Sequence, residues 1–290
     1  MTLCSARVAA VFLMAATMCA TTPLKAADRR GVFVSIAPQK FLVERLVGDA
    51  VEVHVLLPSG ASPATYEPTP KQMAALGTAS LFFLIGAPFE GPLLDKISRV
   101  MPDLQTVDCR SGVELVPMDD HEHGHGESLF DPHIWLDPLR MKIVASTTAD
   151  ALERLLPESG PEIRHNLQRL HDAIDQSHTL IVSILEPHTG ESILVFHPAF
   201  GYFTRRYGLH QIAVEDEGKA PSARRLAEVV RTFDGGSITA IFVQPQFSIS
   251  AAQRVADALE CEVVTLDPLA EIYLANLEIM ANRIAASLRN

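Results

Sequence analysis

Residues 119–138 hold the side chains of this 290-residue sequence that are best suited to chemistry. Four of its eleven histidines fall within this stretch: His121, His123, His125 and His133. Neutral imidazole is the commonest protein ligand for borderline transition metals, and a tract of histidine, glutamate and glycine is typical of a flexible metal-collecting loop. The composition therefore makes zinc the first hypothesis for a ligand.

The stretch has two different parts. The His-rich loop 119–127 carries the first three histidines, and its composition is equally compatible with a disordered surface insertion. His133 is more constrained, because Asp131 and Pro132 precede it in a tight polar turn. We therefore treat His133 as a candidate metal ligand separate from the loop.

Two further candidates follow strand-like runs in the second half of the chain. His197 comes directly after 193–196 and precedes a proline, while Asp267 stands in the same relation to 262–266. Each has a structural alternative: His197 as a core or helix-capping histidine, and Asp267 as the N-cap of the last helix.

Short β-rich runs alternate with amphipathic stretches in both halves, which predicts an α/β fold with two small four-stranded parallel-sheet lobes. The strand-like runs are 32–37, 51–57, 81–85, 105–108, 193–196, 211–214, 238–243 and 262–266. The helical stretches between them are 39–47, 70–79, 91–100, 199–207, 222–233, 251–259 and 271–288.

The middle of the chain has only helical periodicity. We predict an N-terminal lobe over 27–138, a helical linker over 139–190 and a C-terminal lobe over 191–290. Within the linker, Pro161 opens a long rigid backbone helix through residue 185, about 37 Å in length. Ligands of open α/β sheets bind beyond the carboxyl ends of strands, so the metal site is expected in the inter-lobe cleft.

The first 26 residues read as a secretory signal peptide, because a short basic start precedes an apolar run and small residues. Met18 before Cys19 is a poor lipobox residue, so we expect no lipid anchor there. Export predicts a periplasmic or otherwise extracytoplasmic protein. A net charge of −11 argues against nucleic acid and anionic membranes as partners. Cys109 and Cys261 are expected to be unpaired, buried thiols outside any metal site.

Four segments, in order along nearly the whole exported chain, resemble the zinc- and manganese-binding solute-binding proteins of ABC transporters, the ZnuA-like cluster A-I family. They span 58–70, 131–138, 195–203 and 242–248. The resemblance implies two α/β lobes joined by a long rigid helix. It places His133 and His197 on metal-ligand positions and Asp267 on that of a carboxylate ligand, a donor set that suits zinc.

One position departs from the family pattern. The resemblance implies a histidine ligand where this chain has Ala64, which cannot bind metal. Three completions of the site remain open: a water molecule, which we rank first; the Glu67 carboxylate; or one imidazole from His121, His123 and His125. The His-rich loop favours Zn²⁺ over Mn²⁺, because family members selective for zinc often carry one.

The resemblance implies a monomeric, extracytoplasmic protein that captures Zn²⁺ and delivers it to an ABC permease and its ATPase. One alternative is a periplasmic metal buffer or a cell-adhesion protein of the same fold without transport. Another is a zinc hydrolase with Glu67 as general base at the open position. A His-Glu-x-x-His run does occur at 121–125, but it lies in the Gly-spaced loop and not in a helical pattern, as the hydrolase motif requires, so we do not expect an enzyme.

Overall fold

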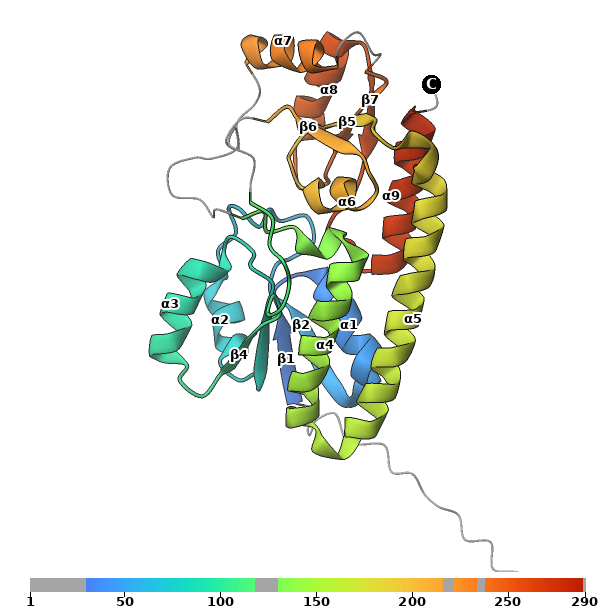
Figure 1. Ribbon diagram of the computed structural model, residues 1–290. Coiled ribbons are helices and arrows are strands. Elements are labelled where there is room, and N and C mark those ends of the chain that lie inside the picture. The colour runs from blue at the N-terminus through green and yellow to red at the C-terminus, as the bar shows by residue number, and fades with distance from the viewer. Residues whose placement is uncertain (1–29, 118–129, 216–221, 234–237, 289–290) are drawn as a thin grey trace, which may run out of the picture.

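The computed structural model describes residues 30–117, 130–215, 222–233 and 238–288. It contains two parallel four-stranded sheets, one in each lobe, as Figure 1 shows. The predicted fold class is therefore confirmed. The signal peptide and the His-rich loop 119–127 lie outside the described residues. The boundaries 27–138, 139–190 and 191–290 stay predictions.

The N-terminal sheet has the strand order β2-β1-β3-β4, with β1 Arg30–Val34, β2 Val51–Val55, β3 Leu81–Leu84 and β4 Gln105–Asp108. Every residue of β3 is buried, as expected for a central strand covered on both faces. The helices of this lobe are α1 Ala37–Val47, α2 Pro70–Leu76, α3 Glu90–Val100 and α4 Pro138–Leu155. Helix α2 starts where it does because Thr69 and Gln72 form a reciprocal capping box in front of Pro70.

The C-terminal sheet repeats this topology, with the order β6-β5-β7-β8. Its strands are β5 Ser192–Val195, β6 His210–Ala213, β7 Ala240–Val243 and β8 Glu262–Thr265. Its helices are α6 Gly201–Arg206, α7 Ala223–Thr232, α8 Ile249–Leu259 and α9 Tyr273–Leu288. The strand-like runs of the sequence fall on the strands of both sheets with ends displaced by at most three residues, a normal error at element boundaries.

Helix α5, Gly160–Leu185, runs alongside both lobes in Figure 1. Its 26 residues span about 39 Å. A stripe of buried side chains follows its length: Ile163, Leu170, Ile174, Ile181 and Leu185. This stripe packs on α1 and α4 of the N-terminal lobe and on α9 of the C-terminal lobe. The helix therefore shares its apolar face between the two lobes.

One hydrophobic core extends through both lobes. It includes Val32 and Phe82 from the first sheet, the α5 stripe, and Phe200, Tyr273 and Ile284 from the second lobe. A smaller second core lies under α7 and α8. No helix in the described parts of the chain is both long and apolar enough to cross a membrane.

The two cysteines of the described chain are unpaired, as predicted. Cys109 is buried, and that burial raises the pKa of its thiol to about 12. Cys261 is only half-buried, so the expectation of a buried thiol was wrong at this position. It directly precedes β8, at the rim of the sheet, where one side of the strand start stays open to solvent.

Candidate metal centre

The structure brings His133 and His197 together from opposite lobes. His197 lies two residues beyond the carboxyl end of β5, and His133 directly precedes the short 3₁₀ turn Ile134–Leu136. Their ring centroids are 5.6 Å apart with the planes inclined by 74°. Side-chain exposure is 13% for His133 and 26% for His197, so solvent reaches both rings.

His133 is held by Asp131. The Asp131 Oδ1 atom accepts the backbone N–H of His133 at 2.9 Å and the ring Nδ1–H at 2.7 Å. A carboxylate only accepts hydrogen bonds, so this contact places the ring proton on Nδ1. The Nε2 lone pair is then available to a metal ion.

His197 is held in the same way by Glu215. The Nδ1–H group donates to Glu215 Oε2 at 2.8 Å, and the Glu215 side chain is only 6% exposed. The ring stacks on Phe247 at a centroid distance of 5.0 Å, and Gln244 Nε2 donates to the His197 carbonyl at 2.9 Å. Backbone and ring are therefore both fixed, with Nε2 again the free nitrogen.

Asp267 follows β8, as predicted, and is half-buried. Its Oδ1 atom accepts Leu269 N–H at 2.9 Å and Gln246 Nε2–H at 3.4 Å. The alternative of a helix N-cap is wrong, because α9 begins six residues later at Tyr273 and the carboxylate caps a local turn instead.

Trp135 joins the two sides of this region. It lies edge-on to His133 at 5.2 Å, and its Nε1–H donates to the Pro268 carbonyl at 2.8 Å, next to Asp267. The hydroxyl of Tyr273, on α9, donates a hydrogen bond to the Trp135 carbonyl at 2.6 Å. The indole therefore lies beside His133 of one lobe and is bonded to the residue that follows Asp267 in the other.

The three predicted ligands do not form one cluster in the structure. Within the described residues, no three side chains of the histidine, cysteine, aspartate or glutamate type lie close enough together to hold a metal ion. The histidine pair is assembled, whereas Asp267 is turned toward Leu269 and Gln246. The ligand set of His133, His197 and Asp267 therefore stays a prediction.

Of the candidates for a further ligand, Glu67 lies within the described residues and forms no metal-binding cluster with the histidine pair there. Ala64 and Glu67 are both exposed on the loop between β2 and α2. His121, His123 and His125 lie outside the described residues. The completion of the site by water, Glu67 or the loop stays open.

Sequence reasoning missed the two orienting carboxylates. Glu215 lies just past the carboxyl end of β6, which pairs directly with the strand that leads to His197. The same rule about strand ends that selected His197 would have selected it. Asp131 stands two residues before His133, and it was considered only as part of the turn.

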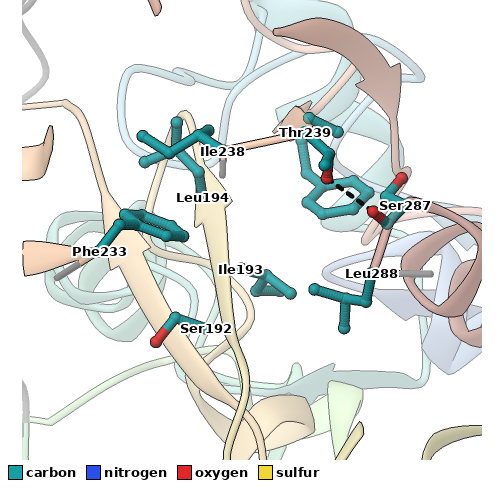
Figure 2. Close-up of a pocket in the computed structure, with 10 residues that line it drawn as sticks. Ser192, Ile193, Leu194, Phe233, Ile238, Thr239, Ser287 and Leu288 are labelled. Carbon is teal, nitrogen blue, oxygen red and sulfur yellow. Dashed lines mark hydrogen bonds between the residues drawn. The ribbon is translucent and has the colours of Figure 1, made fainter. Parts of the chain in front are cut away.

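A hollow in the C-terminal lobe lies at the opposite end of the sheet (Figure 2). Ser192 at the start of β5 and Thr239 just before β7 line it, and Thr239 Oγ1 donates to the Ser287 carbonyl at 2.6 Å. Its described lining has no carboxylate, imidazole or thiol. Its empty space of about 240 Å³ includes open solvent, so the enclosed part is smaller still than the roughly 300–1,000 Å³ of small-molecule sites. The histidine pair remains the better candidate.

Two parallel-sheet lobes, a shared backbone helix and two histidines that face each other from opposite lobes are the features of a two-lobed metal-binding protein of the solute-binding class. Residues 32–287 match the family described as "ZnuA: Zinc-uptake complex component A periplasmic". The chain belongs to this family, the periplasmic component of a zinc-uptake complex. Members are transport components, so the hydrolase alternative is set aside and zinc is a cargo rather than a resident cofactor.

Individual relatives agree with this assignment. The High-affinity zinc uptake system protein ZnuA of Yersinia pestis is 29% identical over 286 residues, covering 89% of this chain and 88% of the relative. A crystal structure of ZnuA superposes with a TM-score of 0.83 at 35% identity, covering 89% of this chain and 99% of that one. A laminin-binding adhesin from Streptococcus agalactiae has a TM-score of 0.77 at 22% identity, which shows a shared fold alone.

Proposed function

We propose that this protein captures Zn²⁺ between its lobes with His133, His197 and Asp267 and delivers it to an ABC permease and its ATPase. The observation that carries the proposal is the pair of imidazoles from opposite lobes, each anchored at Nδ1 by a carboxylate. In zinc sites the ligating histidine usually donates its other N–H to a carboxylate or carbonyl, which fixes the ring and raises its basicity.

The spacing of the rings supports a shared ion. Two imidazoles bound to one tetrahedral zinc at about 2.0–2.1 Å place their ring centroids about 5 Å apart. The observed centroid distance is 5.6 Å, so closure onto an ion needs only a small movement. The proposal also requires the Asp267 carboxylate to turn away from Leu269 and Gln246 toward the pair.

The donor set favours zinc over manganese. Imidazole suits zinc, whereas Mn²⁺ prefers carboxylate, carbonyl and water oxygens. The two neutral imidazoles and one carboxylate leave the dication one positive charge, which the anchoring carboxylates Asp131 and Glu215 offset. Water is our first choice for the remaining position, ahead of Glu67 and the loop histidines.

The test of the ligand set is a zinc titration against a chromophoric chelator. His197→Ala should abolish high-affinity binding, whereas His165→Ala, an exposed histidine on α5, should bind as the wild type does. Equal affinity in the two variants would contradict the proposed site.

A second variant addresses the open position. Ala64→His should tighten zinc binding, because it restores an imidazole where the family resemblance implies one. The expected gain is about tenfold or more, the effect of one well-placed favourable contact of about 1.4 kcal/mol. Unchanged affinity in the same titration would mean that the chain itself already supplies a further ligand.

Transport separates this proposal from the metal-buffer and adhesin alternatives. Cells that lack the protein should take up zinc slowly under limitation, and the wild-type chain should restore uptake while the His197→Ala variant does not. A wild-type chain that binds zinc but leaves uptake unchanged would favour the buffer. We place the protein in the periplasm, without a lipid anchor, as a monomer.

A further inference from the structure

Helix α6 of the C-terminal lobe lies against the segment of the N-terminal lobe that carries His133. The helix begins four residues after His197. Tyr202 Oη on α6 accepts the backbone N–H of Val116 at 2.8 Å, and Arg206 donates to Asp137 at 2.9 and 2.7 Å. Each contact crosses from one lobe to the other, so α6 links the surroundings of the two histidines.

Gly201, the first residue of α6, lies beside Asp131 of the N-terminal lobe. A Cβ atom built on Gly201 would lie 2.8 Å from Asp131 Oδ2, nearer than carbon and oxygen atoms pack without a bond. Gly201 is not among the glycines with positive φ, so its backbone conformation is open to other residues. The absence of a side chain is required here by the carboxylate of the opposite lobe.

Asp131 has little freedom to move away. Its Oδ1 atom already accepts two hydrogen bonds from His133, at 2.9 Å from the backbone and 2.7 Å from the ring, and its side chain is 12% exposed. Any group that pushes Oδ2 must rotate the carboxylate and so displace Oδ1. A disturbance at Gly201 therefore passes to the His133 ring.

We propose that Gly201 is a positioning residue of the metal site, which seats Asp131 against the opposite lobe and thereby fixes the His133 imidazole for zinc. The proposal rests on the function proposed above. In this arrangement the orientation of the His133 ring depends on contact between the two lobes. If the lobes separated, the Asp131 carboxylate would be free to rotate, and it would hold the His133 ring less firmly.

The first experiment compares two glycine-to-alanine variants in the chelator titration. Gly201→Ala should weaken zinc binding by about tenfold or more, the usual effect of disturbing a partner of a metal ligand. Gly91→Ala is the matched control, since Gly91 is also near a helix start and its Cβ would meet nothing within 4 Å. Wild-type affinity in Gly201→Ala overturns the proposal.

A double-variant cycle shows whether the effect passes through Asp131. In the Asp131→Ala background the close contact is gone, so adding Gly201→Ala should change affinity by no more than about twofold. A loss that persists undiminished in that background overturns the proposal. If Gly201→Ala alone fails to fold, the double variant should fold, and failure of both overturns it as well.

A spectroscopic readout distinguishes positioning from general damage. The ¹⁵N shifts of the His133 ring in the metal-free protein should change in Gly201→Ala, while those of His197, held by Glu215, should not. Equal changes at both rings, or none, overturn the proposal. The His197→Ala variant separates the proposed function from the role of Gly201. If His197→Ala binds zinc normally, the proposed function fails. If His197→Ala loses zinc binding while Gly201→Ala does not, only the role of Gly201 is rejected.

Discussion

The two carboxylates that anchor His133 and His197 have different surroundings. Asp131 lies beside Gly201 of the opposite lobe, whereas Glu215 reaches His197 from the neighbouring strand of the same sheet. Glu215 is also the more buried of the two side chains. The C-terminal histidine is therefore fixed by its own lobe.

Glu215→Gln should weaken zinc binding by about ten- to a hundredfold, because an amide can turn either its oxygen or its NH₂ group toward Nδ1 and so fixes the Nδ1–H tautomer less firmly than a carboxylate does. Chelator competition measures the loss. Glu191→Gln provides the control, since Glu191 contacts His188 Nδ1 at 3.0 Å in the same lobe, away from the paired rings. An equal loss in both variants would argue against a specific role for Glu215.

Residue types identified part of this site and could not identify the rest. His133 and His197 were predictable, because each follows a strand or a constraining turn and both lie in family motifs. Glu215 was within reach of the same reasoning. Gly201 was not, since its role depends on a distance between two lobes that no local pattern encodes.

At the scale of elements, Asp137 ties α4 to α6. This fully buried carboxylate caps α4 by accepting Leu139 N–H at 3.0 Å, and it bonds to Arg140 of the same helix and to Arg206 of the other lobe. A buried charge is tolerated because two guanidinium groups and a backbone donor surround it. The ion pair of Asp137 with Arg206 therefore links the two lobes structurally.

Arg206→Met should lower the free energy of unfolding by about 1.5–3 kcal/mol, because the buried Asp137 then loses two charge-assisted hydrogen bonds while Arg140 remains. Denaturant unfolding measures the change. Lys142→Met removes the exposed pair with Asp175 and should cost less than about 1 kcal/mol. A similar small cost for Arg206→Met would show that this link contributes little.

His178 on α5 faces the end of α6, with Nδ1 3.2 Å from the Tyr207 hydroxyl. Burial and the nearby Arg206 lower the pKa of His178 below its ordinary value. The unfolded chain therefore binds this proton more readily than the folded one. The stability that His178 contributes is present above about pH 6.5 and is lost as the pH falls toward the depressed folded pKa.

His178→Gln should accordingly flatten the loss of stability between about pH 7 and about pH 5, measured by denaturant unfolding across that range. His165→Gln, a change at an exposed position of the same helix, should leave the profile as in the wild type. A profile for His178→Gln as steep as that of the wild type would assign the acid sensitivity to other groups.

At the scale of the whole molecule, the main core is continuous. It joins the N-terminal sheet, the α5 stripe and α9 without a break at the lobe boundary. Lobes that share one core and one long helix cannot unfold independently without exposing that common face. The architecture therefore limits large hinge motions.

Calorimetry should show one cooperative unfolding transition for the metal-free protein, with equal calorimetric and van't Hoff enthalpies. Two separated transitions would contradict the continuous core. Zinc should move the single transition to higher temperature, because the proposed site draws its ligands from both lobes and is assembled only in the folded chain.

The overall architecture was accessible from the sequence because period-two and period-3.6 patterns alternate clearly, and Pro161 marks the start of α5 to within one residue. Local patterns contain no information on which lobe surfaces meet. The contacts of Tyr202 with Val116 and of Arg206 with Asp137 join residues far apart in the chain, so only the folded structure reveals them.

Trp135 gives the molecule an optical property of its own. It is the only tryptophan of the chain, 1% exposed, edge-on to His133 and bonded to the Pro268 carbonyl of the other lobe. All indole fluorescence therefore arises from one point between the lobes, beside a candidate ligand. Zinc at the proposed site should therefore change the emission of this one residue, and the unlabelled protein would then report its own loading in real time.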